Sequence, residues 1–299
     1  MPYENLFSHF PKECVAYHEP LAKHTTFAIG GPCDVWLAPY EIGQVQEAWQ
    51  ICQKEGIPIF ALGKGSNLLV SDAGMDGVVL SMEHLQALSI QGDTITCQAG
   101  MSMEDLCNRA CQAGLSGLEF ACGIPGTLGG AIYMNAGAYE GEMKDVVVSV
   151  QVMTLEGEIK ELSAQEAKFS YRHSLLKEQP LLCLSATMRL HPEDKKIIQA
   201  KMDDLMERRR SRQPLELPSA GSTFKRPTGY YAGKLIIEAG MQGHRIGDAQ
   251  VSTKHAGFIV NLGQASAQNV VDLIAQVKEA VYAHSGVSLE PEVRLIGRW

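Results

Sequence analysis

Three short segments of the sequence combine residue types that are common in polar catalysis. They are SYRHS at 170–174, AGSTFK at 220–225 and EPEVR at 290–294. An arginine guanidinium can bind a carboxylate through two parallel hydrogen bonds, and a serine hydroxyl can donate a proton when nearby cations or water assist it. Each segment alone is more often a turn, a helix cap or a strand end, so only the combination indicates catalysis.

A glycine turn, GKGSN at 63–67, could bind pyrophosphate through its main-chain N–H groups, although such a turn is also an ordinary tight connection. It is not a Rossmann dinucleotide-binding turn. The third glycine is missing, and the apolar run 68–70 predicts a strand where that motif has a helix. Residues 229–234 fail as an ATP-binding P-loop, because the spacing is one residue short and Leu235 replaces the required Ser or Thr.

Residues 120–139 are twenty consecutive positions without a charge, the length of a membrane-spanning helix. Five glycines, Pro125 and Asn135 argue against a helix there. We interpret the stretch either as a tightly packed buried loop or as backbone laid against a ligand. Glycine favours the second because it lets main-chain N–H groups come close to a phosphate or a ring.

Composition excludes several classes of protein. The 299 residues are enough for about two domains, and 45% of them are hydrophobic, as in ordinary globular proteins. The formal charge of −8 gives no attraction to nucleic acid or to an anionic membrane. The arginines at 208–210 and 212 fall in the last turns of a predicted helix, where cations complement the helix dipole. The nine histidines have no metal-ligand spacing, so no metal is expected.

The eight cysteines form no Cys-x-x-Cys pair and no dense cluster, which predicts reduced thiols that are mostly buried. Cys107 and Cys111 fall on the buried face of a predicted helix and are expected in the core. The amino terminus has neither a basic leader nor a long apolar stretch, which favours a cytoplasmic location.

Hydrophobic periodicity predicts alternating strands and helices in the first two thirds of the chain. The order strand, helix, strand over 35–38, 42–56 and 58–62 predicts a parallel pair of strands with a crossover helix. A further helix begins after Ser102, where Asp105 can complete the cap. The other predicted strands are 68–70, 78–80, 95–97, 146–153 and 182–190.

The composition changes near residue 195. A charged helix over 192–212 leads into the loop 213–219, and we place a domain boundary at 195–215. The remaining chain has helical patterns at 231–239 and 267–284 and strand patterns at 256–262 and 293–296, enough for a small α+β domain.

Together the motifs resemble those of the UDP-N-acetylenolpyruvoylglucosamine reductases, a family that acts second in peptidoglycan precursor synthesis. The resemblance spans nearly the whole chain, in the family's order. It lies in GKGSN at 63–67, GLEFACGIPGTLGGA at 117–131, MNAGAY at 134–139, Tyr171-Arg172, Gly221-Ser222, KHAGF at 254–258 and Glu292-Val293-Arg294.

The resemblance implies an α+β fold with two parts. Residues 1–200 would form a FAD-binding region of the vanillyl-alcohol-oxidase (PCMH) type with two subdomains, and residues 201–299 a C-terminal α+β substrate-binding domain. The compact carboxy-terminal half is similar to the shorter, type II members of the family, which lack an inserted tyrosine-bearing loop.

The resemblance also implies a reaction, the NADPH-dependent reduction of UDP-N-acetylglucosamine enolpyruvate to UDP-N-acetylmuramate on bound FAD. A hydride from N5 of the reduced flavin adds to the terminal carbon of the enolpyruvyl double bond. Arg172 and Glu292 are then the pair that stabilises the enolate, and Ser222 is the proton donor. NADPH would use the substrate's cleft in a ping-pong cycle. A monomer is expected, although the sequence does not determine the oligomeric state.

Further site residues are carried over from the same resemblance. Tyr171, Lys225, Arg226 and Lys234 are the expected substrate contacts, and Arg226 departs from the asparagine of some members. The expected FAD contacts are Gly63, Lys64, Gly65, Ser66, Asn67, Gly123, Pro125, Gly126, Thr127, Gly129, Gly130, Ala131 and Asn135.

Two other functions stay open at this point. The first is a FAD-linked alcohol or sugar oxidase of the same flavin fold. The absence of a His-linked flavin signature is only weak evidence against it. The second is a catalytically inactive nucleotide-sugar sensor, against which the presence of all three expected catalytic residues speaks.

Overall fold

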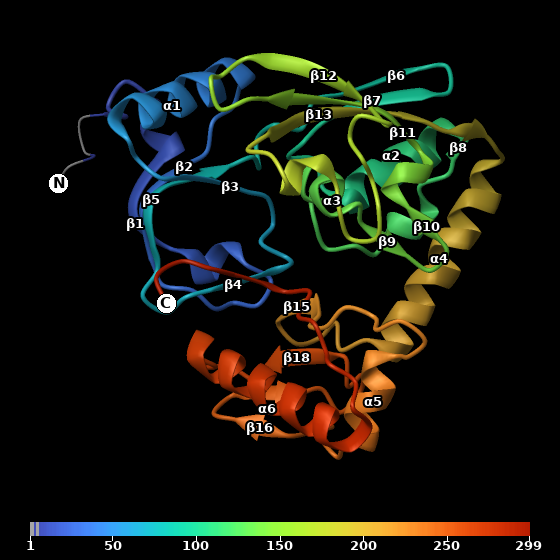
Figure 1. Ribbon diagram of the computed structural model, residues 1–299. Coiled ribbons are helices and arrows are strands. Elements are labelled where there is room, and N and C mark those ends of the chain that lie inside the picture. Colours follow the sequence, from blue (N-terminus) through green and yellow to red (C-terminus); the bar gives the residue numbers. More distant parts are fainter. Residues whose placement is uncertain (1–2, 4–5) are drawn as a thin grey trace. The chain divides into compact units, whose positions relative to one another are not determined.

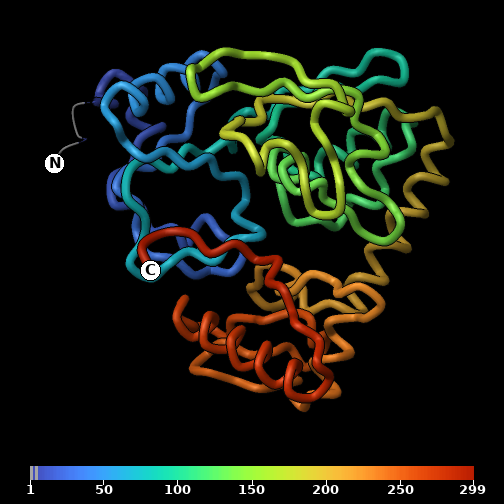
Figure 2. The backbone as a smooth tube through the Cα atoms, in the orientation of Figure 1, coloured from blue at the N-terminus to red at the C-terminus, as the bar shows by residue number. Residues whose placement is uncertain are grey.

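The computed structural model describes Tyr3 and residues 6–299, and the chain divides into two compact units. Unit 1 contains Met1–Tyr17, Val35–Lys64 and Gly77–Arg208, and unit 2 contains His18–Asp34, Gly65–Asp76 and Arg209–Trp299. Figures 1 and 2 trace the chain through these segments. The predicted division at residue 200 concerns which part binds FAD and which binds substrate. Backbone contacts do not test that division, so it stays a prediction.

One sheet, mostly in unit 1, has the strand order β1-β2-β5-β3. Its strands are β1 (Val15–Pro20), β2 (Pro32–Leu37), β5 (Met75–Ser81) and β3 (Ile59–Leu62), and helix α1 (Ile42–Glu55) connects β2 to β3. The predicted strands and helix are confirmed, but the predicted pairing of β2 with β3 is wrong. β3 pairs in parallel with β5, which lies between them. Val78–Ser81 of β5 are all buried, as is typical of an inner strand.

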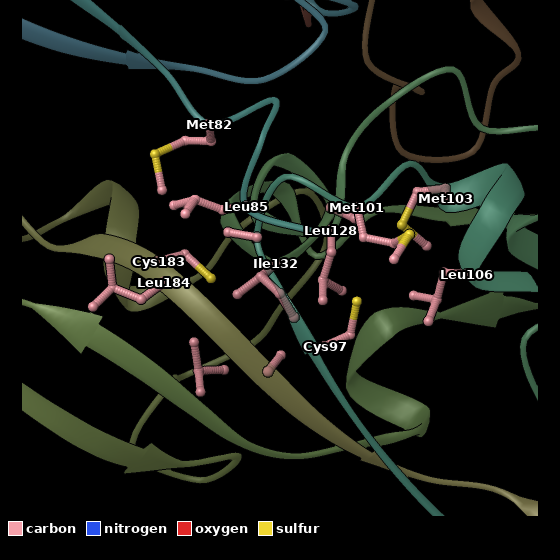
Figure 3. Packing of buried hydrophobic residues seen from close by; sticks show 14 of the residues in the cluster. Met82, Leu85, Cys97, Met101, Met103, Leu106, Leu128, Ile132, Cys183 and Leu184 are labelled. Carbon is pink, nitrogen blue, oxygen red and sulfur yellow. The ribbon is translucent and has the colours of Figure 1, made fainter. Parts of the chain in front are cut away.

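The second sheet of unit 1 is antiparallel, and helices α2 (Met103–Ala113) and α3 (Leu128–Met134) pack near it (Figure 1). Figure 3 shows Leu128 and Ile132 of α3 among Leu85, Cys97 and Leu184, and all five are buried. The Ser102 side chain accepts a hydrogen bond from the Asp105 amide at 3.0 Å, which confirms the predicted cap of α2. In sheet order the strands are β12 (Ile159–Ser163), β11 (Val147–Met153), β13 (Leu182–Arg189), β7 (Thr94–Gln98) and β6 (Leu88–Gln91).

Helix α3 corrects the expectation that no helix occurs within the charge-free stretch 120–139. Thr127 precedes it with an extended backbone, and Asn135 ends it in the left-handed conformation (φ 41°, ψ 56°). Gly129 is needed inside the helix because a Cβ there would lie 2.9 Å from the Cβ of Ala99. The stretch therefore contains a loop followed by a helix of seven residues.

Helix α4 (Lys195–Arg212) begins three residues later than predicted. His191–Pro192 instead forms β14, which pairs with β8 (Leu115–Ser116), and the Glu193 amide donates to the Gly114 carbonyl at 2.9 Å. Those backbone bonds replace the first helical turn. The predicted inner face of α4 is confirmed, because Ile198, Met202 and Leu205 are buried.

Unit 2 is built on the antiparallel sheet β15-β18-β17-β16. Helices α5 (Ala232–Glu238) and α6 (Ala267–Ser285) share a buried hydrophobic core with this sheet. The strands are β15 (Ser219–Ser222), β18 (Phe258–Asn261), β17 (Ala249–Val251) and β16 (Arg245–Ile246). A separate parallel pair joins β4 (Leu68–Val70) to β19 (Arg294–Ile296). The predicted helices and the strands near 258 and 294 are confirmed.

The remaining elements are short. They are β9 (Gly137–Ala138), β10 (Gly141–Glu142) and the 3₁₀ helices Lys12–Cys14, Leu21–His24, Glu119–Ala121, Met143–Asp145 and Leu175–Lys177. Among the described residues, no helix combines the length and the apolar character needed to cross a membrane.

All eight cysteines are buried free thiols, as predicted. Burial raises the pKa of Cys33, Cys52, Cys97 and Cys183 to about 12. These thiols stay protonated at neutral pH and act as small apolar core side chains.

The packing of α3 generates a stability prediction. Ile132→Ala should lower the free energy of unfolding by about 2–5 kcal/mol, because Ile132 is completely buried and its truncation leaves a cavity. Ile197→Ala is the matched control: that side chain is 57% exposed on α4, so its loss should change stability by less than about 1 kcal/mol. Urea unfolding of both variants measures the difference, and equal effects would contradict the assigned core.

Candidate active site

The glycine turn at 63–67 connects β3 to β4 and is closely packed at both of its glycines. A Cβ added at Gly63 would lie 2.3 Å from Oγ1 of Thr127, so the structure brings these two expected FAD contacts together within unit 1. Gly65, in unit 2, has φ +58°, and a Cβ there would lie 2.5 Å from the His24 carbonyl oxygen. Neither position has room for a side chain.

The second glycine segment runs from 123 into α3, and its main chain is fixed on both sides. The Gly126 carbonyl accepts from the Met103 amide at 3.0 Å, and the Leu128 and Gly129 amides donate to the carbonyls of Met101 and Ala99. Thr127 is buried, whereas Pro125 and Gly130 are exposed. The segment therefore presents a rigid backbone with few side chains, a surface against which a flat or anionic ligand can lie.

Glu119 precedes this segment in the chain and had no role assigned from the sequence. Its carboxylate, 2% exposed, accepts from Ser116 Oγ at 2.5 Å and from the Gly117 amide at 2.9 Å. Lys201 Nζ of α4 lies 3.6 Å away. Burial alone would raise the pKa of Glu119, but the hydrogen bonds and the Lys201 ammonium together hold it below its ordinary value. Glu119 is thus a buried carboxylate that fixes the chain at Ser116 and Gly117, ahead of the glycine segment.

Tyr171 and Arg172 occupy the corner of a tight turn in unit 1. Ser170 and His173 exchange two main-chain hydrogen bonds of 3.0 and 3.1 Å, and Arg172 has φ 54°. The Arg172 guanidinium carbon lies 5.2 Å from the centre of the Tyr171 ring, and that ring is 51% exposed. The turn therefore presents a cation and an aromatic ring side by side.

Ser222 and Glu292 both lie in unit 2, on either side of buried Thr223. The Thr223 carbonyl accepts from the Glu292 amide at 2.8 Å, and the Thr223 amide donates to the Gly257 carbonyl at 2.8 Å. Thr223 Oγ1 accepts from the Ile259 amide at 3.0 Å. Thr223 therefore sets the backbone of both expected catalytic residues, although sequence reasoning gave it no role.

A bulge presents Ser222 at the end of β15. The pairing of β15 with β18 shifts register between Ser219 and Ser222, and Gly221 within the shift has φ +74°. Ser222 is exposed as a result.

Asn67 joins the glycine turn to the Glu292 segment. Its Nδ2 donates to the Glu292 carbonyl at 3.2 Å, and its own carbonyl accepts from the Arg294 amide at 3.0 Å. Hydrogen bonds to the main chain thus bring together three expected site residues of unit 2, namely Asn67, Ser222 and Glu292.

The KHAGF motif at 254–258 packs beside Thr223. Nδ1 of half-buried His255 accepts from the Gly257 amide at 3.1 Å, which requires that nitrogen to be unprotonated. Burial also lowers the pKa of His255, so a neutral ring is favoured at pH 7. His255 therefore shapes the Gly257 backbone to which Thr223 binds.

The expected substrate contacts of unit 2 already have partners. Lys225 forms an ion pair with Glu290, and Lys234 lies 3.7 Å from Glu238 one helical turn on. The Arg226 guanidinium stacks 4.0 Å from the centre of the Tyr231 ring. All three cations reach solvent, and an anionic ligand would have to compete with the carboxylates for the two lysines. Within the described part of the chain, no group of three or more His, Cys, Asp or Glu side chains is arranged to hold a metal ion.

Comparison with known proteins identifies both halves of the chain. Residues 33–163 match the family described as "FAD binding domain", and residues 213–296 match "UDP-N-acetylenolpyruvoylglucosamine reductase, C-terminal domain".

Relatives of the same name match over the full length. The UDP-N-acetylenolpyruvoylglucosamine reductase of Syntrophomonas wolfei is 46% identical over 99% of both chains, and that of Limosilactobacillus fermentum is 48% identical over 100% of this chain and 99% of its own. The crystal structure of the Thermus caldophilus enzyme superimposes with a TM-score of 0.81 at 35% identity, covering 94% of this chain and 97% of that one.

The contact of Gly63 with Thr127 generates a prediction about FAD. Gly63→Ala should weaken FAD binding by about tenfold or more, roughly 1.4 kcal/mol, because the added methyl collides with a stiff, buried threonine. Gly43→Ala is the matched control, since a Cβ at Gly43 meets nothing within 4 Å. Titration of the flavin-free variants with FAD measures the affinities. Unchanged FAD affinity in Gly63→Ala would contradict the assignment.

Proposed function

We propose that this chain, which belongs to the UDP-N-acetylenolpyruvoylglucosamine reductase family, reduces UDP-N-acetylglucosamine enolpyruvate to UDP-N-acetylmuramate, with FAD as bound cofactor and NADPH as reductant. The observation that carries the proposal is the presence, in one chain, of the FAD-binding match and the reductase C-terminal match. Arg172, Ser222 and Glu292 are the catalytic residues that the sequence resemblance implies.

The residues present fit a flavin nucleotide. Gly63 and Gly129 lie so close to Thr127 and Ala99 that side chains there would collide, so these two positions present only main chain. We assign these segments, 63–67 and 123–131, to FAD. Bound FAD supplies the hydride, which it receives from NADPH.

Arg172 binds and polarises the substrate carboxylate in this proposal. The planar guanidinium can donate two parallel hydrogen bonds to a carboxylate and stays charged throughout. Negative charge grows on the carbon that bears the carboxylate when the double bond accepts a hydride, so a fixed cation stabilises that charge. The Glu292 carboxyl can help to stabilise that negative charge only while it holds a proton that it can donate.

Ser222 donates the proton that completes the product. Addition of one hydride to the terminal carbon and one proton to the carboxylate-bearing carbon accounts for all atoms gained by the substrate. A serine hydroxyl is a weak acid, so a cation or an ordered water must assist it. Lys225 is three residues away in the chain, and its ammonium is paired with Glu290.

Tyr171, Lys225, Arg226 and Lys234 are assigned to the nucleotide sugar. They offer three cations for a diphosphate and one aromatic ring, that of Tyr171, for a flat group; Arg226 already stacks on Tyr231. The cytoplasmic location and the monomeric state expected from the sequence stay predictions.

The oxidase alternative is not favoured. The two cited relatives and the Thermus caldophilus structure carry the reductase name, and the C-terminal match is specific to that family. The sensor alternative is not favoured either, because an inactive protein would need no proton donor. In this chain a bulge that depends on Gly221 exposes the Ser222 hydroxyl, the proposed donor.

Replacement of Ser222 tests the proposed mechanism. Ser222→Ala should reduce flavin normally with NADPH but slow reoxidation by the enolpyruvyl substrate by about 10²–10⁴-fold, because only the second half-reaction needs the proton. Anaerobic stopped-flow absorbance measures each half-reaction separately. Ser89→Ala, at an exposed position on β6, is the control and should match the wild type in both. Equal reoxidation rates in Ser222→Ala and wild type would rule out Ser222 as the donor.

A further inference from the structure

The turn that carries Arg172 has an unfavourable backbone conformation. Ser170 to His173 form a four-residue turn, and Arg172 occupies its third position with φ 54°. Glycine or asparagine is usual at that position because other side chains crowd the backbone. The turn keeps this conformation only if surrounding contacts hold it.

The last turn of α3 supplies two of those contacts. Nδ2 of Asn135 donates to the Ser170 carbonyl at 2.9 Å, and Oγ of Ser174 donates to the Tyr133 carbonyl at 2.8 Å. Asn135 and Ser174 are both completely buried. A third contact, from Lys177 Nζ to the Arg172 carbonyl at 3.1 Å, acts on the corner itself. The Arg172 turn is thus tied to α3 on both of its sides.

Both N–H donors of the Asn135 side-chain amide are used inside the protein. Its two N–H bonds point to the Ser170 carbonyl and to Glu142 Oε2, the latter at 2.7 Å, and its Oδ1 accepts from the Lys144 amide at 2.9 Å. A primary amide has only two hydrogens to donate. Asn135 therefore has no N–H left for FAD, the ligand to which the sequence resemblance assigned it.

We propose that Asn135 is a positioning residue for Arg172 and not a FAD ligand. It ends α3 in the left-handed conformation and, from that buried point, holds the turn so that the guanidinium is aimed before substrate arrives. Because α3 starts beside Thr127, one short helix connects the backbone assigned to FAD with the turn that carries Arg172. This inference rests on the proposed role of Arg172.

Asn135→Gly is the sharpest variant, because glycine keeps the left-handed helix end while the amide is removed. The holoenzyme should retain wild-type FAD affinity and wild-type reduction by NADPH. Flavin reoxidation by the enolpyruvyl substrate should slow about 10–100-fold, because Arg172 is no longer held in place. Loss of FAD affinity, or equal slowing of both half-reactions, would overturn the inference.

A double-mutant cycle with Arg172→Ala separates positioning from general damage. If Asn135 acts through Arg172, Asn135→Gly should slow reoxidation no further in the Arg172→Ala background. Additive slowing would overturn the inference. An Arg172→Ala enzyme with wild-type reoxidation would instead overturn the proposed role of Arg172, and this inference with it.

Ser174→Ala provides an independent test should Asn135→Gly fold poorly. It removes the other bond to α3 and should give the same selective slowing and the same non-additivity with Arg172→Ala. Ser89→Ala is the matched control and should change neither half-reaction. Ser174→Ala kinetics identical to those of Ser89→Ala would contradict the proposed link between α3 and the turn.

Discussion

Polar groups that are shut away from water must be hydrogen-bonded within the protein, and this constraint determines how each proposed catalytic residue is held. Thr223 uses its amide, carbonyl and hydroxyl to fix the backbone beside Ser222 and Glu292. Asn135 does the same for the turn of Arg172. In both units the proposed catalytic side chains reach solvent, while a neighbouring buried polar residue fixes the backbone that carries them.

Glycine complements these anchors by removing side chains where backbone must come close. Gly63 lies against Thr127 and Gly221 permits the bulge before Ser222. The result is main chain without a side chain at the first position and an exposed hydroxyl at the second. Rigid main chain of this kind can bind a ligand without the entropy cost of ordering long side chains.

Local patterns in the sequence predict the local elements well and the long-range arrangement poorly. The cap of α2, the inner face of α4 and the alternating strand β13 depend on residues a few positions apart, and each was predicted. The placement of β5 between β2 and β3, and the pairing of β4 with β19, join residues far apart in the chain, which periodicity cannot reveal. The same holds for the site: family motifs point to Arg172, Ser222 and Glu292, but Thr223 and Ser174 are ordinary hydroxyl residues until their buried partners are known.

The most direct test of the central claim is an anaerobic visible spectrum of the wild-type protein, recorded as isolated, after NADPH and after UDP-N-acetylglucosamine enolpyruvate. The account predicts an oxidised flavin spectrum that bleaches with NADPH and recovers fully with the enolpyruvyl compound. A flavin that bleaches but does not recover would contradict the assigned acceptor. A colourless protein that cannot be reconstituted with FAD would contradict the account as a whole.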